Sequence, residues 1–94
     1  MAFLQKKGNE TGEMGWYLDP EYWRMGYATE AGLAVIDYMF STLKFRKLTA
    51  PIDNQNIPSW RLAEKLGFTL EYIEYDSDLY GKKADVRFYS ITRK

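Results

Sequence analysis

One strongly periodic helix pattern lies between strand-like segments, and it constrains the fold of this chain more than any other feature. The apolar residues at helical spacing are Leu33, Ile36, Phe40 and Leu43, with Val35 and Met39 widening the stripe. Directly after it, Leu48, Ala50 and Ile52 alternate with Thr49 and Pro51, which is typical of a short strand. Strands that alternate with helices favour a layered α/β architecture.

The remaining segments extend this alternation along the chain. The expected elements are strands at residues 2–6 and 13–18, the helix after a loop that reaches Gly26, a strand at 48–52, a second helix at about 57–66, and strands at 69–78 and 84–92. The predicted order is therefore β-β-α-β-α-β-β. We expect a single domain over residues 1–94, with a mixed, mostly antiparallel sheet and two helices.

The second helix carries clear signals at both of its ends. Asn56 is a good N-cap, and Pro58 is tolerated in a first turn because its missing N–H would be unpaired there anyway. Gly67 is predicted to adopt a left-handed conformation just after the helix. Phe68 would then pack back on Leu62 or Ala63, as in a Schellman motif.

Composition argues against several classes of function. Thirteen basic and thirteen acidic residues cancel, which disfavours a dedicated nucleic-acid binder because phosphate neutralisation dominates that affinity. Cysteine and histidine are both absent, which removes thiolate chemistry, the commonest metal ligand and the commonest general base, so no metal site is expected. No signal peptide is visible and no apolar run approaches the roughly 20 residues of a membrane span, so we expect a cytoplasmic protein that does not engage membranes.

Two segments are candidates for binding chemistry. The loop around Gly26 leads into a helix, whose N-terminus offers unpaired N–H groups and positive potential to a phosphate. Gly26 would let a ligand approach the backbone closely, although on this segment alone an ordinary loop and helix cap is the better explanation. Asn56 and Ser59 form the second candidate. Capping and core packing account for that segment, and they leave room for a second role at the mouth of a cleft.

Taken together, these segments resemble the GNAT superfamily of N-acetyltransferases, of the kind that includes the ribosomal-protein-alanine acetyltransferases. The resemblance rests on residues 18–23 (LDPEYW), 26–31 (GYATEA) and 56–68 (NIPSWRLAEKLGF), and on a final hairpin at 81–89. It covers nearly the whole chain from about Glu13 onward. Family members carry another strand and one or two helices before this point, so the resemblance implies an N-terminally truncated acetyltransferase domain.

The resemblance implies acetyl-coenzyme A as co-substrate and an amine, either a protein N-terminus or a small molecule, as acceptor. The implied coenzyme-binding residues are Tyr17, Leu18, Arg24, Met25, Gly26, Tyr27, Ala28, Thr29, Asn56 and Ser59. In the family the amine attacks the thioester directly, without an acyl-enzyme. Arg24 departs from the small residue usual at its position. It would either constrain the phosphate loop or add a cation for a phosphate.

Catalysis by direct attack needs a group that takes the proton of the amine. Glu13 and Asp78 are the candidate bases, although most carboxylates on a small domain are simply solvated. The resemblance implies that Ser59 lies near the sulfur, where it could donate a hydrogen bond to the departing thiolate.

Two other functions stay open at this point. The chain could hold coenzyme A as a half-domain with little or no catalysis, or it could be a nucleic-acid-binding α/β sandwich, which its neutral charge disfavours. A first strand without an outer neighbour would leave an open sheet edge, and such edges invite pairing with another chain. We therefore expect a homodimer, since two-fold interfaces are the simplest closed solution.

Overall fold

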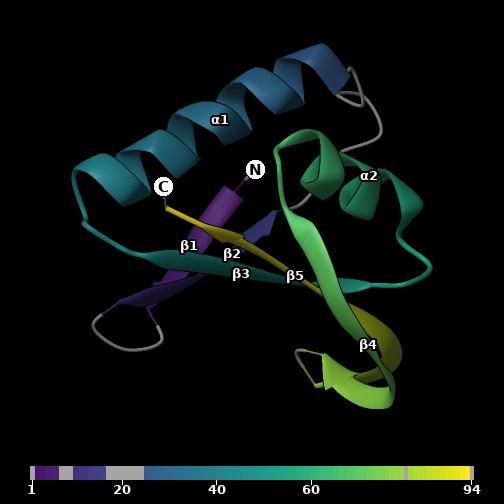
Figure 1. The fold of residues 1–94 in the computed structure, drawn as a ribbon. Coiled ribbons are helices and arrows are strands. Elements are labelled where there is room, and N and C mark those ends of the chain that lie inside the picture. Colours follow the sequence, from purple (N-terminus) through teal and green to yellow (C-terminus); the bar gives the residue numbers. More distant parts are fainter. Residues whose placement is uncertain (1, 7–9, 17–24, 80, 94) are drawn as a thin grey trace.

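The chain follows the predicted order of strands and helices. The computed structural model describes residues 2–6, 10–16, 25–79 and 81–93. Its elements are β1 (Ala2–Lys6), β2 (Thr11–Trp16), α1 (Met25–Ser41), β3 (Lys47–Asp53), α2 (Ile57–Lys65), β4 (Thr69–Leu79) and β5 (Lys82–Thr92) (Figure 1). Compared with the sequence expectation, α1 and β5 begin earlier and β2 is shifted toward the N-terminus.

All five strands form one sheet in the order β1-β2-β3-β5-β4. Only β2 and β3 run parallel, whereas β1–β2, β3–β5 and β4–β5 are antiparallel pairs. This confirms the expected mixed, mostly antiparallel sheet. The helix α1 lies in the connection between the two parallel strands, because antiparallel neighbours can be joined by tight turns while parallel neighbours need a crossover.

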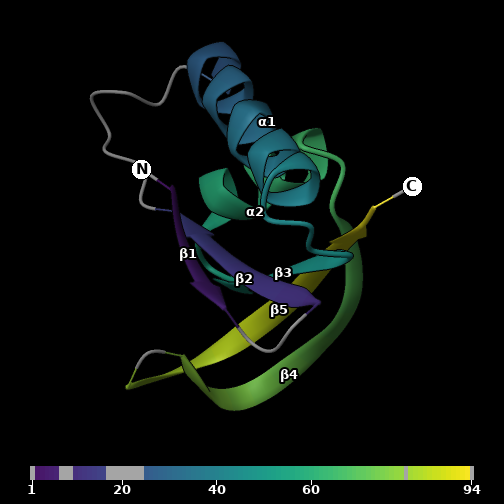
Figure 2. The ribbon, with the colours of Figure 1, turned by 90° about the vertical axis from the view of Figure 1, so that its left-hand side faces the viewer.

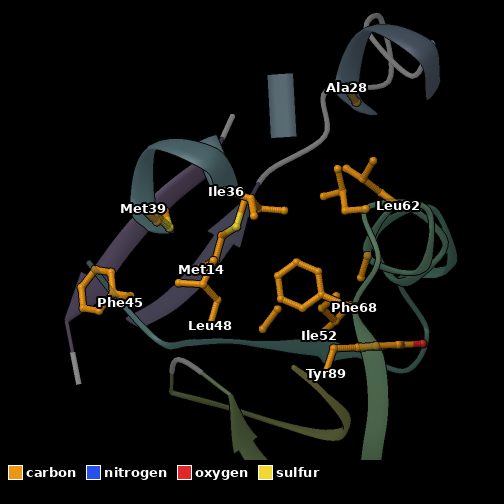
Figure 3. Close-up of a cluster of buried hydrophobic side chains, with 13 residues drawn as sticks. Met14, Ala28, Ile36, Met39, Phe45, Leu48, Ile52, Leu62, Phe68 and Tyr89 are labelled. Carbon is orange, nitrogen blue, oxygen red and sulfur yellow. The ribbon is translucent and has the colours of Figure 1, made fainter. Parts of the chain in front are cut away.

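Both helices cover the same face of the sheet (Figure 2). The core fills the space between α1, α2 and that face (Figure 3). Its buried residues are Met14, Ala28, Ile36, Met39, Phe45, Leu48, Ala50, Ile52, Leu62, Ala63, Leu66, Phe68 and Tyr89. The alternation predicted for β3 is confirmed, since its three apolar residues are buried and the residues between them are only partly so. Each large aliphatic side chain buried in this way contributes roughly 1.5–3 kcal/mol.

The buried face of α1 differs from the predicted stripe. Leu33 is 49% exposed and Leu43, which lies beyond the end of the helix, is 40% exposed. Ala28 and Gly32 are buried instead. An ideal Cβ atom at Gly32 would lie 2.8 Å from Cδ2 of Leu66, so α1 approaches the end of α2 too closely for a larger side chain. The close contact between the helices therefore selects small residues on the buried face, which a count of large apolar residues misses.

The ends of α2 match the sequence expectation in part. Asn56 occupies the N-cap position, but its side chain makes no capping hydrogen bond. Its carbonyl oxygen instead accepts hydrogen bonds from the N–H groups of Ser59 and Trp60, at 3.1 and 3.2 Å. At the other end, Gly67 has φ of 101° and the N–H of Phe68 donates to the carbonyl of Ala63 at 3.0 Å, which confirms the Schellman motif.

Within the described residues, no helix is both long enough and apolar enough to cross a membrane.

Candidate functional site

The parallel strands β2 and β3 separate partway along their length. They pair at Thr11–Lys47, Gly12–Leu48 and Glu13–Thr49, and the pairing then stops. Beyond this point β2 continues to Trp16 against β1, and β3 continues to Asp53 against β5. The facing edges of residues 14–16 and 50–53 therefore have no ladder between them. We call this opening the wedge.

The starts of both helices lie on the side of the sheet toward which the wedge opens. Parallel strands point their carboxyl ends the same way, and α2 begins only a short turn after β3 ends. The N-terminal end of α1 lies on the same side of the molecule as α2 (Figure 1). The first N–H groups of a helix have no intrahelical partners and carry partial positive charge, so the start of α1 presents donors to an anion or a polar ligand. At the start of α2, Pro58 has no N–H, and the N–H groups of Ser59 and Trp60 already donate to the carbonyl oxygen of Asn56.

Two buried hydroxyl groups near these helix starts lack hydrogen-bond partners within the described part of the chain. They are Oγ1 of Thr29 on α1 and Oγ of Ser59 on α2. Ser59 is only 3% exposed. A buried hydroxyl that makes no hydrogen bond costs roughly 1–3 kcal/mol, so native structures seldom keep one without a reason. A ligand with polar groups along its length would satisfy such atoms, and both residues were predicted to bind the coenzyme.

Of the two candidate bases, the structure brings Glu13 to the wedge. Glu13 forms the last residue pair between β2 and β3, and it is 5% exposed. Its neighbour Met14 points into the core under the helices (Figure 3), so alternation along the strand directs Glu13 to the opposite face. A carboxylate there lies at the point where the strands begin to diverge.

Asp78 pairs with Lys83 next to the turn of the β4–β5 hairpin. This end of the hairpin lies away from both helices (Figures 1 and 2). It is exposed, and its Oδ1 accepts a hydrogen bond from the N–H of Gly81 at 2.9 Å. Gly81 has φ of 84°, so this bond supports a tight turn. The structure therefore gives Asp78 a role in the hairpin and does not bring it together with Ser59.

The other predicted coenzyme-binding residues divide into three groups. Tyr17, Leu18 and Arg24 lie outside the described residues. Met25, Gly26 and Tyr27 open α1, and only their backbone is described here. The methyl group of Ala28 packs in the core, so only its backbone remains for a ligand (Figure 3). Asn56 is exposed at the start of α2, where its side chain makes no capping hydrogen bond.

Sequence reasoning missed a cluster of polar side chains between α2 and β5. Nε of Arg87 donates to Oδ1 of Asn54 at 2.7 Å, and its guanidinium lies 4.0 Å from the ring centre of Trp60. Tyr89 accepts from Nη1 of Arg87 at 3.1 Å and donates to Glu64 at 2.8 Å. Burial, with a smaller contribution from the Glu64 carboxylate, raises the pKa of Tyr89 above 10.0. The available signal was the need of buried Tyr and Trp for polar partners.

A separate hollow of about 500 Å³ lies toward the C-terminal end of α1. The residues that line it are Phe40, Gly67, Thr69, Ser90, Ile91 and Thr92. None of them is ionisable, and the Ser90 hydroxyl already donates to Glu71. This hollow offers little chemistry compared with the wedge.

Comparison with known proteins agrees with this geometry. Residues 2–69 match the acetyltransferase (GNAT) domain family. An uncharacterised N-acetyltransferase of Bacillus subtilis is 35% identical over 71 residues, which cover 76% of this chain and 42% of that protein. A spermidine N(1)-acetyltransferase of Escherichia coli is 37% identical over 54 residues, which cover 57% of this chain and 29% of that protein.

A solved GNAT-family acetyltransferase from Bacillus anthracis superposes with a TM-score of 0.86 and 32% identity, covering 97% of this chain and 56% of that one. The chain thus spans about half the length of the proteins that it matches, and the family match covers most of its own residues. This chain belongs to the GNAT family of acetyltransferases.

Proposed function

We propose that the chain binds acetyl-coenzyme A in the wedge and forms the coenzyme-binding part of an N-acetyltransferase for primary amines. The observation that carries this proposal is the pair of unpartnered buried hydroxyls, Thr29 and Ser59, at two helix starts beside strands that separate. Family membership supplies the class of ligand, and these residues supply polar groups that fit a long polar molecule.

Each part of the coenzyme has a matching feature in the chain. The N–H groups at the start of α1 would hold the pyrophosphate, as helix starts commonly do. The edges of β2 and β3 within the wedge would offer backbone donors and acceptors to the amide groups of the pantetheine arm. Thr29, Asn56 and Ser59 would add side-chain contacts along this path.

The bound co-substrate supplies an acetyl thioester, and the residues of this chain would assist its transfer. The carboxylate of Glu13 would accept the proton that the amine must lose. The hydroxyl of Ser59 would donate a hydrogen bond to the sulfur, where negative charge develops as the bond to the acetyl group breaks. Asp78 remains the alternative base, although its place in the hairpin turn favours Glu13.

The acceptor that we propose is the N-terminal amine of a protein, as in the ribosomal-protein-alanine acetyltransferases, in a cytoplasmic homodimer. The similarity to spermidine N(1)-acetyltransferase favours a polyamine as the second acceptor class. The second candidate function is a coenzyme A-binding half-domain with little or no transfer.

Thermal unfolding with coenzyme A tests the binding proposal directly. At 100 times its dissociation constant, a ligand that binds only the folded state adds about 2.7 kcal/mol of stability. The melting temperature should therefore rise with coenzyme A, whereas Gly26→Val should fold but lose most of the rise, because its side chain blocks the approach to the α1 start. An unchanged melting temperature for the folded chain at millimolar coenzyme A would refute binding in the wedge.

A transfer assay with N-terminal peptides and polyamines tests the catalytic part. Ser59→Ala should lower kcat by about one to two orders of magnitude while the Kd of coenzyme A stays within about twofold, because its contact strengthens late in the reaction. Ser41→Ala is the matched control, since Ser41 bonds to Asp37 on the exposed side of α1. If the parent chain binds coenzyme A but transfers no acetyl group, the second candidate function, the coenzyme A-binding half-domain, is correct.

A further inference from the structure

Few interactions within α2 itself stabilise the position of its first turn. The helix has only nine residues, a length at which an isolated helix is unstable in water. Its N-cap residue makes no side-chain capping bond, and Pro58 in the first turn contributes no N–H. The position of Ser59 therefore depends on contacts from outside the helix.

Arg87 on β5 supplies these contacts from one side chain. It donates to Oδ1 of Asn54 in the connection before α2, and its planar guanidinium lies over the ring of Trp60, the residue after Ser59. The indole N–H of Trp60 in turn donates to the carbonyl oxygen of Asn54 at 3.1 Å. Arg87, Asn54 and Trp60 thus form a closed triangle of contacts that spans the turn into the helix.

Arg87 makes further contacts toward the middle of α2. Nη1 of Arg87 donates to the Tyr89 hydroxyl and lies 4.0 Å from Oε2 of Glu64, to which the same hydroxyl donates. The Arg87 side chain is only 21% exposed, so these interactions are partly shielded from water. Lysine could not replace it, because an ammonium group lacks both the fork of N–H donors and the flat surface that stacks on an aromatic ring.

We infer that Arg87 is a positioning residue that fixes the first turn of α2 on the sheet and thereby holds the Ser59 hydroxyl at the wedge. This inference rests on the proposed function for its catalytic consequence. Its structural part, that Arg87 holds the turn, stands on the contacts alone.

Hydrogen exchange tests the structural part without any need for activity. In Arg87→Lys, the indole N–H of Trp60 and the amide N–H groups of Ser59 and Trp60 should exchange at least about tenfold faster, the equivalent of one lost hydrogen bond. Amides in the β3–β5 ladder should keep their rates. Arg61→Lys is the matched control, because Arg61 is exposed on α2 and lies 6.0 Å from the same ring. Unchanged rates in Arg87→Lys would overturn the inference.

Steady-state kinetics tests the catalytic part. Arg87→Lys should lower kcat about tenfold with the Kd of coenzyme A nearly unchanged, and in a Ser59→Ala background it should lower kcat no further, because it acts through Ser59. A merely structural role would reduce the folded fraction and give additive losses, which would overturn the inference. If Arg87→Lys fails to fold, Asn54→Ala removes one contact and should shift exchange and kcat the same way. A parent chain that binds coenzyme A without transfer would refute the proposed catalytic role of Ser59 in this chain, while exchange still decides the role of Arg87.

Discussion

Thr29 carries a buried hydroxyl that has no hydrogen-bond partner among the described residues. Replacing it with the similarly shaped valine should raise the free energy of unfolding by about 1 kcal/mol, because a buried group without a partner is removed. The same change should weaken coenzyme A binding. Urea unfolding and a coenzyme titration measure the two effects, and Thr42→Val, at an exposed position, should change neither. A loss of stability in Thr29→Val would show that the hydroxyl has a partner.

Glu71 joins three strands on the face away from the helices. Its Oε1 accepts from Ser90 on β5 at 2.6 Å and lies 2.9 Å from Nζ of Lys47 on β3. These contacts, the Ser90 hydrogen bond first, hold the pKa of Glu71 below its ordinary 4.5. The resulting stabilisation is complete above that value and is lost as the pH falls through the lower folded-state pKa. Melting temperatures measured from about pH 6 to 3 should therefore fall more steeply for the parent than for Glu71→Gln. Parallel curves would exclude this contribution.

The sequence offers candidate site residues where a motif or a resemblance carries them, and it misses residues that meet only through distant contacts. The resemblance implied the role of Ser59, which stays a prediction, and the structure shows its hydroxyl buried without a hydrogen-bond partner among the described residues. The Arg87 cluster could not be predicted, because Arg87 and Asn54 meet only through the register of β5 against β3. The sequence also could not rank Glu13 against Asp78 as the base, because the distance of Asp78 from the wedge depends on how the whole β4–β5 hairpin folds.

The contact of α1 with α2 depends on Gly32. Alanine there would gain about 1 kcal/mol in helix propensity, but its Cβ would lie within 3 Å of both methyl groups of Leu66, which is 4% exposed and would have to shift. Gly32→Ala should therefore lower the free energy of unfolding by roughly 1 kcal/mol. In a Leu66→Val background, where the nearest atoms are gone, the same change should be neutral or stabilising. Urea unfolding of the four proteins measures the coupling, and additive effects would contradict it.

Element boundaries and faces were predictable only in part. The order of all elements and the C-terminal end of α2 follow from local patterns, whereas Asn56 occupies the N-cap position without a side-chain capping hydrogen bond. The buried face of α1 was predicted in part: Ile36 and Met39 are buried as expected, whereas Leu33 and Leu43 are exposed. The small residues Ala28 and Gly32, which the apolar pattern did not mark, are buried as well. The irregularities of β4 were not predicted either. Its register shifts between Leu70 and Tyr72 and again between Glu74 and Ser77, and Asp76 has φ of 52°. Such bulges follow from the bending of a long hairpin and leave no clear local pattern.

The molecule as a whole presents surfaces suited to association. β1 is an edge strand, as predicted, and the face without helices carries Tyr72, which is 51% exposed and stacks on Phe88 at 4.7 Å. We predict that the chain forms a homodimer. Light scattering should give twice the monomer mass at high micromolar concentration, and Phe3→Lys on β1 should shift it toward monomer by charging the edge strand. A monomer over the whole concentration range, with cooperative unfolding, would contradict the prediction.

The short pairing of β2 with β3 has a consequence for how the molecule comes apart. Three residue pairs join the N-terminal hairpin to the rest of the sheet, whereas β3 and β5 pair along seven. The hairpin is therefore the segment that should detach first under stress and dock last during folding, after a loop of more than thirty residues closes. A ligand lying between β2 and β3 would bridge the two strands where their backbone pairing stops. The binding free energy of such a ligand would then include the free energy of docking the hairpin. A substitution that loosens the hairpin would therefore weaken ligand binding even at a position that does not contact the ligand.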